Sequence, residues 1–242
     1  MAKTVGFGCS LKLQWLNKAF QLLEENLSES EFKNALNEYL SYEIEKETRL
    51  RKTREILMNI WYYDNPDIVP FRKRAISLLN SFPEYASAIH LCMIYLTYPV
   101  VADIGKYMGR LFEYHDEITN TALRQKLYDE WGERGALQTT TRRVTLTLKE
   151  LGFLESASRV RYRLVKQRIA KERIISFLIL VGMTLDGNSY YSFSDLCFFD
   201  VLFPFEYSIS KEEIMNDKSF AVANFGGELS IALKSDFIHV ES

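Results

Sequence analysis

The chain has 242 residues, of which 47% are hydrophobic and 26% are charged, and its formal net charge is −2. This composition is that of a globular protein, argues against a disordered chain, and excludes a polycation that binds nucleic acid with its whole surface. The cysteines Cys9, Cys92 and Cys197 lie far apart, which fits neither a disulfide framework nor a zinc-binding spacing. Such cysteine usage indicates a reducing compartment, so we expect a cytoplasmic protein.

Residues 1–115 are expected to form an all-α domain, a bundle of about six helices joined by short connections. One helix start is well marked, because Ser28 or Ser30 can cap it and Glu31 follows in its first turn. The next helix carries dense charge of both signs over residues 43–55. Mixed charge of this kind is typical of a solvated helix face, and a second nucleic-acid contact is the alternative.

Residues 86–102 form an apolar run that is barely long enough to cross a membrane. The run contains His90 and Pro99, and it continues directly into Asp103. We therefore interpret it as a buried core helix that breaks or bends at Pro99, and we expect no membrane contact.

Residues 116–170 are predicted to form two short helices and a strand hairpin, which is the layout of a winged helix-turn-helix element. Thr119 or Asn120 can cap the first helix. One face of that helix is apolar, because Leu123, Leu127 and Trp131 follow at intervals of four residues. Gly132 and Gly135 then supply the turn between the two helices.

The second helix of this element is expected to begin after Thr139, Thr140 and Thr141, whose side chains can cap its N-terminus. Val144, Leu148 and Leu151 fall on one side of the helix, which we expect to face the core. The opposite side is expected to carry Arg142, Thr145 and Lys149, with Arg143 beside them. Gly152 is a suitable residue to end the helix.

The predicted hairpin has a basic second strand. Val160, Tyr162 and Leu164 alternate there with Arg159, Arg161 and Arg163. An alternation with a period of two indicates a half-buried strand with a row of arginines on its open face.

Charge is uneven along the chain. Residues 139–173 contain ten Lys or Arg and three Glu, a local net charge of +7, whereas residues 174–242 have a local net charge of −7. A helix face of Arg, Thr and Lys suits the major groove of double-stranded DNA, an arginine-rich hairpin suits the phosphate backbone, and threonines at a helix N-terminus suit a phosphate. The candidate DNA-binding residues are therefore Thr139, Thr140, Thr141, Arg142, Arg143, Thr145, Lys149, Arg159, Arg161 and Arg163. Two alternatives stay open: a winged helix that contacts only proteins, and an ordinary helix and hairpin with a solvated basic face.

Residues 171–242 are expected to form a small α+β subdomain with much aromatic surface, part of which could dock a partner. Residues 174–185 predict an apolar helix or strand, and Ser210 with Glu213 has the form of a capping box. Two alternating runs separated by Gly226 and Gly227 predict a β-hairpin.

No catalytic or phosphate-binding motif is present, and the three histidines show no metal-binding spacing. Asp195, Asp200 and Glu206 could in principle meet around a metal ion, but nothing in their spacing requires it. We therefore expect no enzyme, no metal and no cofactor.

Three stretches together resemble a known family: EENLSESEFKNALNEYLSYEIEKETRLRKTREIL, YLTYPVVADIGKYM and YDEWGERGALQTTTRRVTLTLKELGFL. They are similar to the BrxA-type small accessory proteins of bacterial BREX phage-defence islands, over roughly residues 5–165. Trp131, the pair Arg142 and Arg143, and residues 151–154 stand at the places of that family's tryptophan, Arg-rich helix and closing motif. The resemblance implies a cytosolic, non-enzymatic DNA-binding member of a defence system that works with a methyltransferase and other subunits. Residues after about 168 depart from the pattern.

The sequence thus predicts a mainly α protein with a small β part: an N-terminal helical bundle, a central winged-helix-like element and a small α+β C-terminal subdomain. The expected partner is double-stranded DNA, together with other subunits of a defence complex. The alternatives are an assembly adaptor that does not touch DNA and a winged-helix transcription regulator.

Overall fold

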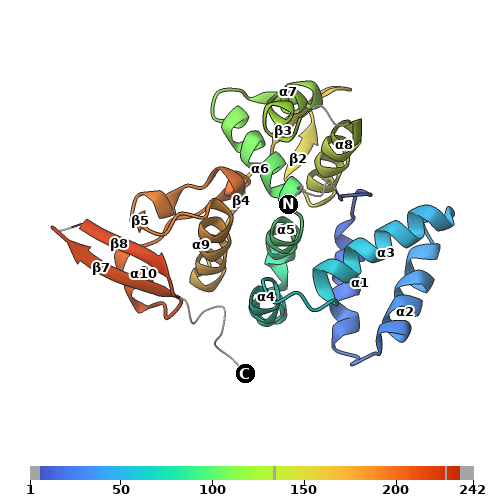
Figure 1. Cartoon of the computed structure of the whole chain (residues 1–242), viewed down its shortest axis with the longest axis horizontal. Coiled ribbons are helices and arrows are strands. Elements are labelled where there is room, and N and C mark those ends of the chain that lie inside the picture. The colour runs from blue at the N-terminus through green and yellow to red at the C-terminus, as the bar shows by residue number, and fades with distance from the viewer. Residues whose placement is uncertain (1–5, 133–134, 227, 235–242) are drawn as a thin grey trace.

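The helical first half of the chain agrees with the prediction from the sequence. The computed structural model describes residues 6–132, 135–226 and 228–234 (Figure 1). Within residues 6–115 it contains the α-helices α1 (Leu13–Leu23), α2 (Glu29–Ser41), α3 (Glu47–Trp61), α4 (Val69–Ser81), α5 (Ala86–Thr97) and α6 (Pro99–Phe112), with a short 3-10 helix, η1, at Pro83–Tyr85. The expected bundle of about six helices is therefore confirmed.

Capping and proline explain where several of these helices begin. Ser28 caps α2: its hydroxyl accepts from the Glu31 amide, and the Glu31 carboxylate accepts from the Ser28 amide. Pro99 stands at the first turn of α6, where its missing N–H is not needed. The chain bends by 118° between the helical stretch before Pro99 and α6. Nearly all of α5 is buried, so the apolar run serves as the core helix that the sequence predicts.

No single helix in the described part of the chain is both long enough and apolar enough to cross a membrane. The helical stretches Pro83–Thr97 and Pro99–Phe112 reach that length and composition only when they are taken together, across their bend.

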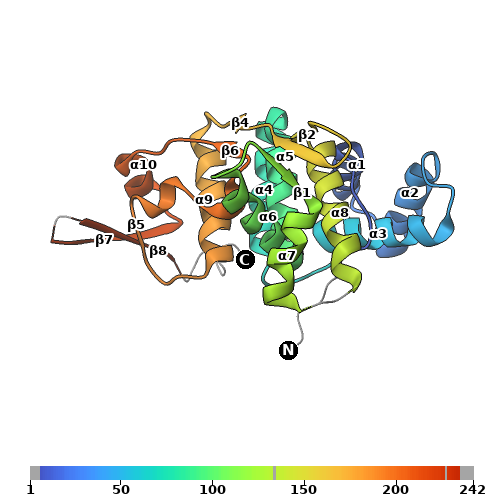
Figure 2. The same cartoon turned by 90° about the horizontal axis from the view of Figure 1, so that it is seen from above.

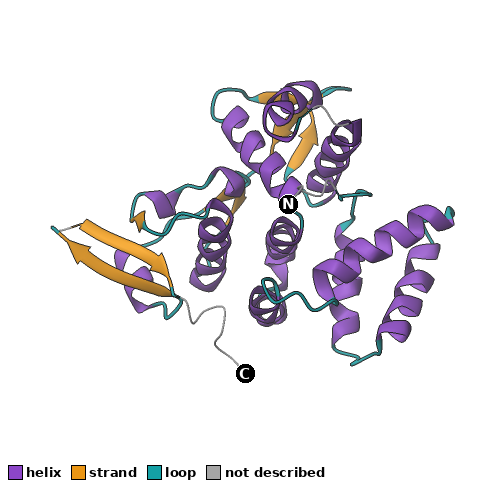
Figure 3. Ribbon diagram, in the orientation of Figure 1, coloured by secondary structure: helices purple, strands orange, loops and turns teal. Residues whose placement is uncertain are grey.

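A winged-helix-like element follows α6. Its parts are β1 (Glu117–Thr119), α7 (Asn120–Trp131), α8 (Gly135–Glu150), β2 (Leu154–Ser156) and β3 (Arg161–Leu164). The three strands form an antiparallel sheet in the order β1-β3-β2, so the strand before the two helices pairs with the last strand of the element. Figure 3 shows this small sheet beside α7 and α8.

Local signals fix both helices of this element. The hydroxyl of Thr119 accepts from the Ala122 amide at 3.2 Å and caps α7. Gly152 ends α8 with a positive φ of 84°, which glycine adopts without steric cost. The amides of Gly152 and Phe153 donate to the carbonyls of Lys149 and Leu148, which is the hydrogen-bond pattern of a Schellman motif.

The C-terminal part is built on α9 (Glu172–Asp186), which shows that the apolar run after residue 173 is a helix. The two-residue strands β4 (Gln167–Arg168) and β6 (Phe205–Glu206) pair in parallel beside it. A second sheet has the order β5-β8-β7, from β5 (Tyr191–Ser192), β7 (Phe220–Phe225) and β8 (Glu228–Leu233). The remaining elements are the 3-10 helices η2 (Asp195–Cys197) and η3 (Asp200–Leu202), and α10 (Lys211–Asn216), which begins with the predicted Ser210 capping box. The hairpin of β7 and β8 is also confirmed, although Gly227 in its turn lies outside the described residues.

One connected set of buried side chains runs through all of these parts, from Phe7 to Ile231. α9 packs on α4 and α5, and η3 packs on α6. The winged-helix-like element and the β7–β8 hairpin lie on different sides of the helical body, as Figures 1 and 2 show. The element is thus held on a scaffold that the rest of the chain provides.

Candidate nucleic-acid interface

The inward side of α8 is wider than the sequence predicts. Val144, Leu148 and Leu151 are buried as expected, but Thr140, Thr141 and Thr145 are buried as well. The Thr145 hydroxyl donates to Asn120 Oδ1 at 2.6 Å, and the Thr141 carbonyl lies 3.0 Å away. The assignment of Thr140, Thr141 and Thr145 to a DNA-binding surface is therefore wrong.

The predicted phosphate site at the three threonines is also wrong, because α8 begins four residues before Thr139, at Gly135. The threonines thus lie inside the helix, where their amides donate to helix carbonyls. A buried threonine in a helix satisfies its hydroxyl by donating to the carbonyl four residues earlier. Thr141 does so toward Leu137 at 2.8 Å. Leu137 is buried seven residues before Val144, so extending the apolar stripe backward would have indicated the earlier helix start.

The outward side of α8 keeps three of the predicted residues, because Thr139, Arg142 and Lys149 are exposed. The Lys149 ammonium donates to the Ser156 hydroxyl of β2 at 2.8 Å, which orients the side chain without neutralising its charge. Arg143 is half-buried at the edge of this face, and its guanidinium donates to the Phe7 carbonyl at 3.5 Å.

β3 shows the predicted alternation. Arg161 and Arg163 are exposed, with 61% and 53% of their side-chain surface accessible, while Tyr162 and Leu164 are half-buried. Val160 does not continue the pattern, because it precedes the strand and is 62% exposed.

Two carboxylates flank the strand arginines, which the sequence did not predict. Glu117 in β1 and Glu155 in β2 are the cross-strand neighbours of Arg163, one on each side. The Glu117 carboxylate lies 3.0 Å from the Arg163 guanidinium and 3.6 Å from that of Arg161, and Glu155 lies 3.4 Å from Arg163. The open face of the sheet is therefore locally balanced in charge and is not the positive row that β3 alone suggests.

Arg159 is different from the two strand arginines. It lies in the turn between β2 and β3, it is exposed, and it forms no ion pair within the described residues. The wing therefore presents one unpaired arginine at its turn and two paired arginines on its strand.

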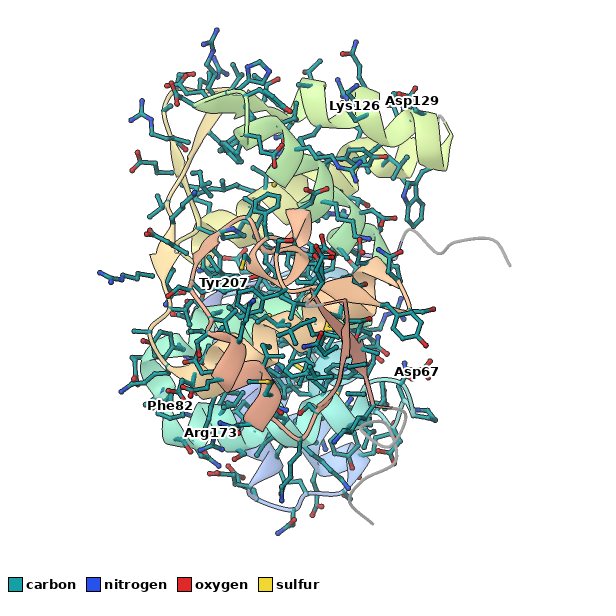
Figure 4. All side chains as sticks on the ribbon, turned by 90° about the vertical axis from the view of Figure 1, so that its left-hand side faces the viewer. Asp67, Phe82, Lys126, Asp129, Arg173 and Tyr207 are labelled. Carbon is teal, nitrogen blue, oxygen red and sulfur yellow. The ribbon has the colours of Figure 1, made fainter. Side chains whose placement is uncertain are left out.

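The basic run of residues 139–173 does not form one patch in space. Lys171 and Arg173 both lie over the Phe82 ring, 5.9 Å and 5.7 Å from its centroid, and Arg173 also donates to the Ser77 hydroxyl. Figure 4 shows Arg173 and Phe82 together, well separated from Lys126 and Asp129 on α7. Lys171 and Arg173 therefore lie apart from the basic side chains of α8, the wing turn and β3.

Other candidate groups do not gather into a site. Among the described residues there is no group of three or more His, Cys, Asp and Glu side chains that could hold a metal ion. His90 is fully buried, where desolvation lowers its pKa to about 3, and its Nε2 lies 2.8 Å from Asn17 Oδ1. The C-terminal aromatic region is partly core, but Tyr190 and Phe198 are exposed, as expected of a region with aromatic surface.

Comparisons of the chain with protein-family models, with curated proteins and with solved structures found no match.

Proposed function

We propose that this chain is a non-enzymatic double-stranded DNA-binding accessory protein, which contacts DNA through its winged-helix-like element. The observation that carries the proposal is the outward face of α8, where Arg142 and Lys149 are exposed and form no ion pair in the part of the chain that is described. In a winged helix, the second helix enters the major groove and the wing contacts the neighbouring backbone. In this proposal Arg159, at the wing turn, makes that second contact.

The roles of the individual residues follow from their chemistry. Arg142 presents a planar guanidinium, which can donate to the guanine edge or to a phosphate. Lys149 and Arg159 are better suited to phosphate, because each brings a charge at the rim of the face that no carboxylate neutralises among the described residues. The Thr139 hydroxyl can donate a hydrogen bond to a phosphate of the DNA backbone. Arg161 and Arg163 contribute only to the extent that DNA competes with Glu117 and Glu155 for them.

A binding titration of the full chain with a mixed-sequence duplex tests the proposal. Because phosphate neutralisation releases counterions, the dissociation constant should rise steeply with salt. The double variant Arg142→Ala, Lys149→Ala should weaken binding roughly ten- to thirtyfold at ~0.15 M salt and lower the salt slope by about two. The charge-matched control is Lys218→Ala, Lys234→Ala, which removes two exposed lysines beside the β7–β8 hairpin and should leave binding nearly unchanged.

Two outcomes count against the proposal. If the wild-type chain retains no duplex DNA at ~50 mM salt, the proposal is wrong, since nonspecific binding is strongest at low salt. The assembly adaptor is then the better interpretation. Equal effects of the two double variants would show that binding follows total charge and not the face of α8.

We propose that the protein works in a bacterial phage-defence system and that other subunits of the defence complex are further partners. The resemblance of the sequence to BrxA-type proteins supports this, including Trp131 and the pair Arg142 and Arg143. The exposed aromatic side chains Tyr190 and Phe198 offer a contact for such a subunit. The genes beside this one test the setting: a methyltransferase gene and a phosphatase-like gene are expected there, and their absence would contradict it.

A further inference from the structure

Residues 7–11, which precede α1, run between α8 and α3 and contact both helices. On the α8 side, the Leu11 amide donates to the Thr147 hydroxyl at 3.0 Å, and Arg143 donates to the Phe7 carbonyl. On the α3 side, the Cys9 thiol donates to the Arg49 carbonyl at 3.9 Å. A Cβ added to Gly8 would lie 3.8 Å from Lys52 Cδ, so the lysine stem passes over this glycine. Figures 1 and 2 both show the segment between the two helices.

These contacts place α8 between two different neighbours. Lys149, on one flank of its exposed face, donates to Ser156 of the wing. Arg143, on the other flank, donates to the segment that lies against α3. The wing and α3 therefore stand on opposite sides of the proposed recognition helix.

A basic part of α3 lies against this segment. The Lys52 stem passes over Gly8, and the backbone carbonyl of Arg49 accepts from Cys9. Arg49 lies three residues before Lys52 and thus on the same helix face. Both are exposed, and neither forms an ion pair with another described residue. Arg54 differs, since it is paired with Glu55 at 2.7 Å. Glu45 and Glu47 lie nearby at the start of α3, but no ion pair joins them to Arg49 or Lys52 within the part of the chain described.

We propose that Arg49 and Lys52 of α3 bind the DNA phosphate backbone on the side of α8 opposite the wing. The inference rests on the proposed function and extends its footprint. A helix in the major groove has a phosphate backbone on each side of it. The wing serves one backbone, and the basic face of α3 serves the other. The segment of residues 7–11 contacts both helices, so the wing, α8 and α3 can act as one surface.

The experiment compares the full-length wild-type chain with three double variants in the same salt-dependent titration: Arg49→Ala with Lys52→Ala, Arg142→Ala with Lys149→Ala, and the control Lys218→Ala with Lys234→Ala. The α3 variant should weaken binding roughly tenfold at ~0.15 M salt and lower the salt slope by about two, uniformly across DNA sequences. Because all six side chains are exposed, the variants should fold, and coincident thermal unfolding curves check this.

A backbone footprint on a single bound duplex locates the contact. The wild-type chain should protect phosphates on both sides of the groove, and the α3 variant should lose protection at the side away from the wing only. This inference is wrong, and the proposed function stands, if the α8 variant weakens binding while the α3 variant behaves like the control. The same holds if the α3 variant still protects phosphates on both sides of the groove. If the wild-type chain binds no DNA, both are wrong.

Discussion

The carboxylate of Glu117 lies between the two arginines of β3 and determines how much of their charge a phosphate can reach. Glu117 contacts Arg163 at 3.0 Å and Arg161 at 3.6 Å. An exposed ion pair of this kind contributes only about 0–1 kcal/mol to stability, because water and salt screen it. It can nevertheless compete directly with a phosphate for the same guanidinium groups.

Replacing Glu117 by Gln should therefore strengthen DNA binding. The amide keeps the shape of the side chain but removes its charge, so Arg161 and Arg163 become available to phosphate. We expect a roughly three- to tenfold lower dissociation constant and a steeper salt dependence, measured by the same titration. The matched control is Glu228→Gln at the start of β8, which removes one negative charge far from α8. If the two variants have the same affinity and salt slope, the strand arginines do not lie near the DNA.

The sequence does not predict which threonines of α8 are buried. Thr139 and Thr145 have the same chemistry, yet one is exposed and the other is buried. The Thr145 hydroxyl is satisfied by Asn120 from the neighbouring helix and by its own helix. The sequence predicts that Arg142 and Lys149 are exposed, because a charged side chain is almost never fully buried unless it is paired. It does not predict the position of a threonine, whose hydroxyl can either meet water or be satisfied inside the protein.

At the scale of elements, Gly109 permits a close contact between the backbones of α6 and η3. A Cβ added there would lie 2.1 Å from the Asp200 carbonyl oxygen of η3. The same two elements are joined by an ion pair between Arg110 and Asp200 at 2.6 Å and by stacking of Phe112 on Phe203. Without a side chain at Gly109, the two backbones can approach each other to this distance.

The substitution Gly109→Ala should lower the free energy of unfolding by roughly 1–3 kcal/mol, since the backbone of η3 has to shift to admit the methyl group. This cost opposes the gain of up to about 1 kcal/mol that alanine brings to a helix interior. Gly135→Ala is the control, because a Cβ at this exposed first residue of α8 meets nothing within 4 Å. Urea unfolding should show a lower midpoint for the first variant only. Equal midpoints would mean that η3 does not press on α6 in solution.

Elements with a strong signal of their own could be predicted, and those formed by tertiary contact could not. The capping boxes of Ser28 and Ser210 and the alternation in β7 and β8 are local, and the structure contains the elements that they predict. β1 has three residues, and β4 and β6 have two each, which is too short for any periodicity to show. Their pairing depends on the helices that bring them together, so the sequence did not reveal that Glu117 lies next to Arg163.

At the scale of the whole molecule, the net charge of a stretch of sequence differs from the charge of the surface to which it contributes. The run of residues 139–173 has a net charge of +7 in sequence, but Arg163 lies between two glutamates and Arg173 packs on Phe82. Arg49 and Lys52, about ninety residues earlier in the chain, instead lie near α8 through the segment of residues 7–11. The candidate surface is thus assembled from two distant parts of the sequence, which only the fold can show.

A partly buried polar network joins the segment before β7 to α4 and α9. Arg74 of α4 donates to the hydroxyls of Ser176 and Ser219, both at 2.7 Å. Asp217 accepts from Ser176 and from the Ser219 amide, and it lies 3.5 Å from Arg74. Arg74, Ser176 and Asp217 border a hollow of about 470 Å³ between α9 and α10. Burial alone would raise the pKa of Asp217, but the hydrogen bonds from Ser176 and Ser219 and the charge of Arg74 together hold that pKa below its ordinary value.

This pKa shift makes the stability of the whole molecule depend on pH. A carboxyl group whose pKa is lower in the folded state stabilises the fold when the pH is above its unfolded pKa, near 4, and the stabilisation is lost as the pH falls through the folded pKa. Asp217→Asn should therefore lower the free energy of unfolding at pH 7, and the difference from the wild-type chain should narrow as the pH falls below about 4. Denaturant unfolding at a series of pH values measures that difference.

The difference between the two proteins isolates Asp217 from the other carboxylates with lowered pKa values, such as Glu43 and Glu55, because both proteins contain them and their contributions cancel. Asp116→Asn, at an exposed position before β1, controls for the loss of one negative charge and should leave the curve close to that of the wild-type chain. A gap between the wild-type chain and Asp217→Asn that stays constant from pH 7 to pH 3 would show that the carboxylate charge is not what stabilises the network. In that case hydrogen-bond geometry alone, which an amide can partly reproduce, would join the sheet to the body.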